Sequence, residues 1–182
     1  MTDDPFLINV AGLLGDGVGA TRTLDVADAT VALPDDLVLS EPIAGTIRLI
    51  HENRGIIART NLTTALVGEC ARCLRPTSTP VHIELEEEYL PSIDLASGRP
   101  ITNDDEPDAL RLTDHHELDL GPSIVDAISL AEPIAPLDRP DCPGLCVVCG
   151  LPLDEGVHDH PSDDIDPRLE ALRGFTPAAD DE

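Results

Sequence analysis

The 182-residue sequence predicts an α+β fold, mostly an antiparallel β meander or sheet, with short helices toward the C-terminus. Three observations predict this class. Apolar and polar residues alternate through three consecutive segments between residues 42 and 90, which is the period of a half-exposed strand. Turn residues separate these segments. Two short segments with helical spacing of apolar residues follow after residue 120.

The three alternating segments predict a meander with one face toward solvent. Between the first two, the sequence Asn53–Arg54–Gly55 predicts a hairpin turn, because Asn and Gly tolerate a positive φ. In the third, apolar residues alternate with the acidic Glu84, Glu86 and Glu88. The positions expected on the buried face are Ile43, Ile47, Leu49, Ile56, Ala58, Leu62, Leu66, Val81, Ile83 and Leu85.

The remaining segments predict a single domain over residues 1–182. Residues 1–40 predict two short extended segments around the glycines at 15, 17 and 19, which lack the Lys and the following amphipathic helix of a phosphate loop. An acidic loop is expected at 91–118 and a cysteine-bearing segment at 138–174. Pro122 suits the first turn of a helix that ends before Pro133, and a short helix is expected between Asp166 and Gly174.

The composition restricts the classes of function. The net charge is -25, and all 11 basic residues are Arg, so the chain as a whole repels phosphate backbones and anionic membranes. The acidic N-terminus does not resemble a signal peptide, so we expect a cytoplasmic protein with reduced cysteines. The sequence contains no nucleophile elbow, Walker loop or His-Glu-x-x-His motif. We therefore expect neither an enzyme nor a small-molecule substrate.

The five cysteines indicate a metal site. Cys70 with Cys73 and Cys146 with Cys149 form two Cys-x-x-Cys pairs, the turn from which zinc ribbons are built. In one arrangement these four thiolates share a structural zinc ion and Cys142 is spare, and this arrangement is our preferred prediction. In a second, Cys142, Cys146 and Cys149 bind locally, and Asp138, His158 or His160 is the fourth ligand.

Two other interpretations of the cysteines remain open. All five thiols could be free and buried, since Cys packs as a small apolar residue. Thiolates could also hold an iron–sulfur cluster. The spacing Cys142-x3-Cys146-x2-Cys149 matches that of radical-SAM enzymes, but only residues 150–182 follow, which is too short for their barrel.

Positive charge is concentrated in one stretch. Residues 48–75 carry a local net charge of +3, in contrast to the rest of the chain. An acidic protein could bind RNA or a partner through such a patch. Alternatively, these arginines pair with acidic neighbours on an exposed face, where ion pairs contribute little to stability. The five arginines are Arg48, Arg54, Arg59, Arg72 and Arg75.

Three motifs together resemble the YceD family of large ribosomal RNA subunit accumulation proteins. They are "GECARCLRP", "PIAPLDRPDCPGLCVVCGLPL" and "DPRLEAL", in this order, after an opening "NVAGLLG". The resemblance implies a non-catalytic role in making or stabilising 23S rRNA, with 23S rRNA, a pre-50S particle or a large-subunit ribosomal protein as partner. Family members often carry a further Cys after the Pro-Leu pair, where this chain has Asp138. An acidic adaptor for a basic ribosomal protein is the alternative function.

Overall fold

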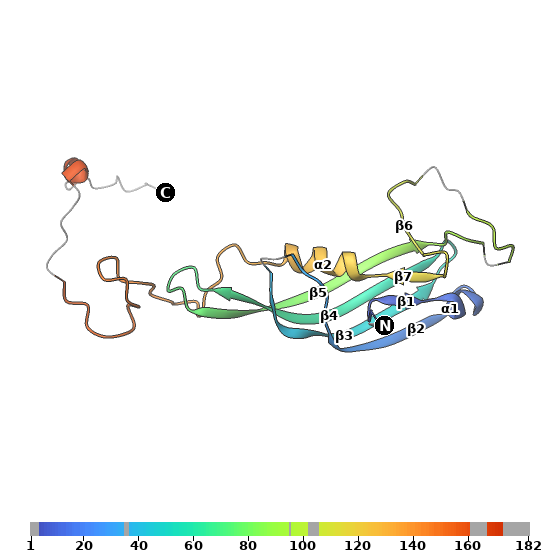
Figure 1. Ribbon diagram of the computed structural model, residues 1–182, viewed down its shortest axis with the longest axis horizontal. Helices are drawn as coiled ribbons and strands as arrows, with labels where there is room; N and C mark the ends of the chain where they lie inside the picture. Colours follow the sequence, from blue (N-terminus) through green and yellow to red (C-terminus); the bar gives the residue numbers. More distant parts are fainter. Residues whose placement is uncertain (1–3, 35–36, 95, 102–105, 161–166, 173–182) are drawn as a thin grey trace, which may run out of the picture.

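The computed structural model describes residues 4–34, 37–94, 96–101, 106–160 and 167–172. A five-stranded sheet has the order β2-β3-β4-β5-β6, and a two-stranded sheet pairs β1 with β7. Pairing is antiparallel except between β5 and the short β6. The predicted α+β class is confirmed (Figure 1). The strands are β1 (Leu7–Asn9), β2 (Thr21–Ala29), β3 (Leu39–His51), β4 (Ile56–Glu69), β5 (Pro76–Leu90), β6 (Leu110–Arg111) and β7 (Glu117–Asp119).

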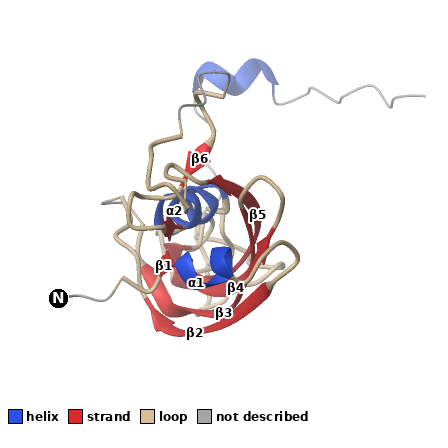
Figure 2. Ribbon diagram, turned by 90° about the vertical axis from the view of Figure 1, so that its right-hand side faces the viewer, coloured by secondary structure: helices blue, strands red, loops and turns tan. Residues whose placement is uncertain are grey.

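The core lies inside the curve of the large sheet, which wraps around the helices α1 (Ala11–Gly15) and α2 (Gly121–Leu130) (Figure 2). The predicted apolar face of the meander is buried, with Leu85 partly exposed, and the three alternating glutamates are exposed. Helix α2 contributes the fully buried Ile124 and Ile128. Tyr89 anchors the two sheets to each other, because its hydroxyl donates a 2.7 Å hydrogen bond to the carbonyl oxygen of Asp119.

Two glycines are required by close packing between strands. The predicted hairpin turn forms at residues 52–55, although neither Asn53 nor Gly55 uses the positive φ that these residues tolerate. Gly55 is needed because a Cβ atom there would lie 2.1 Å from the carbonyl oxygen of Tyr89. At Gly45 in β3, φ is +144° and a Cβ atom would lie 2.2 Å from the carbonyl oxygen of Asn61. These positions let neighbouring backbones approach more closely than a side chain would allow.

Other segments differ in part from the expectation. The range 91–118 is not loop throughout, since β6 and the start of β7 lie in it and pair with β5 and β1. The C-terminal helix is a 3₁₀ helix at Pro167–Leu172, while its expected caps, Asp166 and Gly174, lie outside the described residues. Among the described residues, the helices are too short or too polar to span a bilayer.

The β4–β5 hairpin positions the first cysteine pair. These strands stay in register from Ile56↔Tyr89 to Glu69↔Pro76, so the hairpin tip projects at one end of the elongated molecule. Figure 1 shows the segment after α2 passing this tip and continuing beyond the sheet. The chain thereby brings both cysteine-bearing regions to the same end of the fold.

Candidate metal centres

The first Cys-x-x-Cys pair forms the tight turn, or knuckle, between β4 and β5. The Cys70 amide donates to the carbonyl of Arg75 at 2.8 Å, and the Leu74 amide donates to the carbonyl of Cys70 at 2.9 Å. Leu74 adopts a φ of 60°, which is rare for a residue with a branched side chain. This geometry buries Cys70 and Cys73 on the inside of the turn.

A distant segment completes the surroundings of this knuckle. The Ala71 amide donates to the carbonyl of Pro136 at 2.8 Å, and Arg72 Nη1 donates to the carbonyl of Cys142 at 2.8 Å. These contacts bring two further ligand candidates to the first pair. The first cluster consists of Cys70, Cys73, Asp138 and Cys142, whose ligand atoms all lie within 4.8 Å of one another.

The thiols of the first cluster have opposed pKa shifts. Burial raises the pKa of Cys70, but hydrogen bonds from the backbone around Asp138, Cys73 and Arg72 outweigh it and lower the pKa to about 7. Burial, reinforced by the Asp138 carboxylate and the other two thiols, raises the pKa of Cys142 to about 12. Hydrogen bonds from Cys142 and Cys70 hold the pKa of Asp138 below its ordinary value. The Asp138 carboxyl is thus ionised at neutral pH, and Cys70 loses its proton more readily than an ordinary thiol.

The second Cys-x-x-Cys pair repeats the hydrogen bonds of the first knuckle. The Cys146 amide donates to the carbonyl of Leu151 at 2.8 Å, and the Gly150 amide donates to the carbonyl of Cys146 at 2.9 Å. Gly150, with a φ of 72°, occupies the position that Leu74 has in the first knuckle. A glycine at this position lets the backbone adopt the positive φ that the turn requires.

Two histidines complete the second cluster, which consists of Cys146, Cys149, His158 and His160, again with ligand atoms within 4.8 Å of one another. Cys149 Sγ lies 3.5 Å from His158 Nδ1, and His158 Nε2 lies 3.0 Å from the Pro152 carbonyl oxygen. Hydrogen bonds from the Cys149 and Val148 amides lower the pKa of Cys146 to about 6, against the effect of burial. Cys146 is therefore poised as a thiolate.

The distances within both clusters suit a tetrahedral metal ion. Zinc–sulfur bonds of about 2.3 Å give tetrahedral sulfur–sulfur edges of about 3.8 Å, and replacing one sulfur with nitrogen or oxygen shortens the edge to about 3.6 Å. Cys70 Sγ lies 3.7 Å from Cys142 Sγ and 3.4 Å from Asp138 Oδ1. The Cys149–His158 separation is also close to such an edge. Each cluster offers a complete set of four donors that could hold one metal ion.

An ion-pair network joins the two clusters. Arg75 of the first knuckle makes a bidentate contact with Asp154 at 2.6 and 2.8 Å, and its Nη1 lies 3.6 Å from Asp138 Oδ2. Arg139 Nη2 also contacts Asp154, at 2.7 Å. These two arginines hold the pKa of Asp154 well below its usual range. Asp154 lies between Cys149 and His158 in the chain, so the network orients the second cluster relative to the first.

The eight predicted ligands are therefore grouped differently from either expected arrangement. Among the described residues, the two Cys-x-x-Cys pairs do not share a site, so our preferred four-thiolate set is not formed. Cys142 joins Cys70 and Cys73 instead of the nearer Cys146 and Cys149. The set of Cys70, Cys73, Asp138 and Cys142 was not predicted from the sequence. The signal that could have indicated it is the number of candidate donors, because eight donors are enough for two four-coordinate ions.

Most of the predicted arginine patch is already engaged. Arg54 pairs with Glu88 and Glu106, Arg59 with Glu86, and Arg75 with the network around Asp154. Arg72 donates to the Cys142 carbonyl, as described above. Arg48 is exposed and lies opposite Arg59 in the β3–β4 pairing. The five arginines are thus distributed along the sheet and its tip.

Comparisons with known proteins place this arrangement in a family. Residues 58–176 match the family described as "Large ribosomal RNA subunit accumulation protein YceD". Uncharacterized proteins of Mycobacterium tuberculosis and Mycobacterium bovis are 39% identical over 127 residues, which cover 69% of this chain and 58% of theirs. A Mycobacterium leprae protein is 34% identical over 128 residues, or 69% of this chain and 55% of its own.

The chain spans less than two thirds of the length of these relatives. No solved structure gives a significant match. The family match covers both clusters and more than half of the sequence. The chain therefore belongs to the YceD family.

Proposed function

We propose that this protein is a non-catalytic factor in the biogenesis of the large ribosomal subunit, where it supports the synthesis, processing or stability of 23S rRNA. The observation that carries the proposal is the family match over residues 58–176, since the family is described by the accumulation of large-subunit rRNA. This role would place the protein in the cytoplasm, where ribosomes assemble.

Deletion of the gene tests this role directly. We expect the ratio of 23S to 16S rRNA to fall in the deletion strain and to recover when the wild-type chain is supplied. A variant of Val18, an exposed residue remote from both clusters, serves as a control that should also restore the ratio. An unchanged ratio in the deletion strain would contradict the proposed role.

We further propose that both clusters bind zinc and that the zinc is structural. A catalytic zinc ion keeps a coordination position open for water, whereas each cluster here offers four protein donors. The purified protein should contain two equivalents of zinc and be colourless. A coloured protein with iron and sulfide would contradict the choice of zinc.

Direct binding to 23S rRNA or to a pre-50S particle is the first candidate for the mode of action. Arg48 and Arg59 form the part of the predicted patch that lies on the exposed face of the sheet. Changing both to Glu should weaken binding to rRNA by at least tenfold, while Arg99→Glu, outside the patch, should not. Equal rRNA binding by the wild type, the double Glu variant and Arg99→Glu would argue against RNA contact through this patch.

An acidic adaptor for a basic ribosomal protein is the second candidate. The observation that favours it is the engagement of Arg54, Arg59 and Arg75 by carboxylates, which leaves less positive charge for phosphate groups. Treatment of the native complex with RNase separates the two modes. A protein adaptor complex should survive RNase, and a direct RNA complex should not.

A further inference from the structure

Exposed apolar side chains gather at the end of the molecule that carries the clusters. Of 15 large apolar side chains that are exposed among the described residues, five lie in residues 147–157 around the second cluster. Leu74 lies in the first knuckle, and four more lie just before β3, near the end of β4, and at or beyond the end of α2. They are Val38 and Val67, with 56% and 49% exposure, and Leu130 and Ile134, with 87% and 105%. Concentrated exposed apolar surface is typical of a protein-interaction site.

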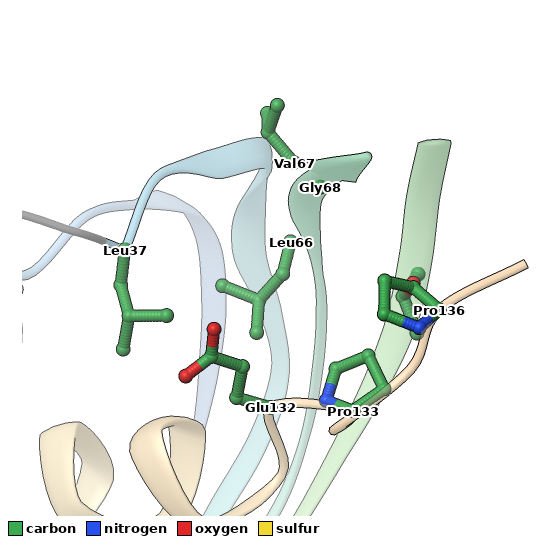
Figure 3. Close-up of a pocket in the computed structure, with 8 residues that line it drawn as sticks. Leu37, Leu66, Val67, Gly68, Glu132, Pro133 and Pro136 are labelled. Carbon is green, nitrogen blue, oxygen red and sulfur yellow. The ribbon is translucent and has the colours of Figure 1, made fainter. Parts of the chain in front are cut away.

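A shallow pocket lies within this second group. Leu37, which precedes β3, and residues of β4 and β5 line one side of it, while the segment after α2 lines the other. Figure 3 shows the side chains of Leu37, Leu66 and Glu132 converging, with Pro133 and Pro136 on the segment that closes the pocket. The pocket is thus a shallow hollow with mostly apolar walls.

The segment that forms one wall of this pocket is also the segment that leads into the first cluster. Pro136 is held by the Ala71 amide, and Asp138 follows two residues later as a candidate ligand. A metal ion bound there would fix residues 133–138 against the β4–β5 tip. The pocket is therefore a consequence of the same contacts that assemble the first cluster.

The charges around the pocket select a cationic partner. Glu132 is the only charged residue among its described lining residues, and no arginine lines it. The chain as a whole carries a charge of -25. A phosphate backbone would be repelled here, whereas a Lys or Arg next to an apolar side chain would satisfy both Glu132 and the pocket.

We propose that this pocket and the four apolar residues around it form a docking surface for a cationic, apolar segment of a ribosomal protein. The occupant is a protein and not RNA, because the surface combines apolar contact with negative charge. Ribosomal proteins are suitable partners because they must neutralise rRNA phosphates and are therefore rich in Lys and Arg. The inference rests on the proposed function and names the partner class and the surface for its adaptor mode.

The test measures the affinity of the zinc-loaded full chain for purified large-subunit ribosomal proteins, taken one by one. At least one should bind with submicromolar affinity. Ile134→Asp and Glu132→Lys should each weaken that binding at least tenfold. Val18→Asp is the matched control, because it adds the same charge at an exposed position outside this surface. Circular dichroism and zinc content should be unchanged in all three variants, since these side chains are exposed.

The two Asp variants separate docking from general attraction. Each adds one negative charge, so nonspecific attraction of a basic protein would increase in both, whereas docking in the pocket is lost only with Ile134→Asp. Equal binding by the two variants would overturn the docking surface. Binding of rRNA with no binding of any ribosomal protein would overturn the partner class.

The rRNA ratio in the deletion strain shows which proposal has failed. If the wild-type chain restores 23S rRNA but binds none of the ribosomal proteins, only the docking inference is overturned. If deletion leaves the ratio unchanged, the proposed function fails, whatever the binding result.

Discussion

Loss of the first metal site should destabilise the sheet far more than loss of the second. A metal ion bound by Cys70, Cys73, Asp138 and Cys142 would link positions about 70 residues apart in the sequence. By the relation between loop length and cross-link entropy, such a link contributes up to about 4 kcal/mol to folding stability. For a domain of this size, loss of that contribution should lower the melting temperature by roughly 10 °C.

The second site closes only the local loop from Cys146 to His160. Among its residues only Cys146 is buried, and none belongs to the main apolar core. We therefore expect Cys146→Ser to remove one zinc equivalent and to change the melting temperature of the sheet by less than about 2 °C. Unfolding of residues 146–160 in this variant would not expose the core.

The assay combines zinc analysis with thermal unfolding followed by far-ultraviolet circular dichroism. Cys70→Ser should leave one zinc equivalent and lower the melting temperature by roughly 10 °C. A metal chelator should then produce little further shift in this variant. The reasoning is refuted if both variants lose the same stability, or if Cys70→Ser retains two zinc ions.

Three further predictions concern the backbone and the thiols. In chemical denaturation, Gly45→Ala should lower the free energy of unfolding by about 2–4 kcal/mol, because the new Cβ atom would clash with a carbonyl of β4 and residue 45 has a positive φ. Gly12→Ala is the control, and it should be neutral or stabilising because the space around Gly12 is open. Leu74→Gly should raise stability by about 0.5–1 kcal/mol, because relief of the positive φ exceeds the added chain entropy, and a lower denaturation midpoint would contradict this. Metal affinity at the first cluster should rise with pH through the neutral range, because the Cys142 thiol, with its pKa raised to about 12, must lose a proton to bind the ion. In the second cluster, Cys146 has a pKa of about 6 and has already lost its proton at neutral pH. Calorimetry in buffers of different ionisation enthalpy should therefore detect more protons released per metal in Cys146→Ser than in Cys70→Ser, and the reverse order would contradict the assignment.

The local pattern of the sequence was sufficient for the sheet but not for its close contacts. The alternation through Ile43, Ile47 and Leu49 predicts which face is buried, because side chains of a strand alternate between its two faces. The need for glycine at position 55 comes from the approach of β5, which is a tertiary contact. Local turn propensity explains Gly55 by its tolerance of a positive φ, whereas the structure requires glycine because the Tyr89 carbonyl lies too close for a side chain.

The ligands were predictable as a set, but their grouping was not. Cys-x-x-Cys spacing identifies a knuckle, because both thiolates of such a turn can reach one ion. Whether Cys142 binds with Cys146 or with Cys70 depends on the path of the chain after α2, which places Pro136 against Ala71. Spacing along the sequence favours grouping Cys142 with Cys146, whereas the fold places it beside Cys70.

The repeated knuckle also has a consequence for the order of assembly. The four ligands of the second cluster lie within about 15 residues, so they can meet by rapid local loop closure. Those of the first cluster meet only after β5, β6, β7 and α2 have been placed, which is a slow, nonlocal step. A refolding chain should therefore take up the two proposed zinc ions in succession, with the ion nearer the C-terminus bound first and the other bound only when the sheet is complete.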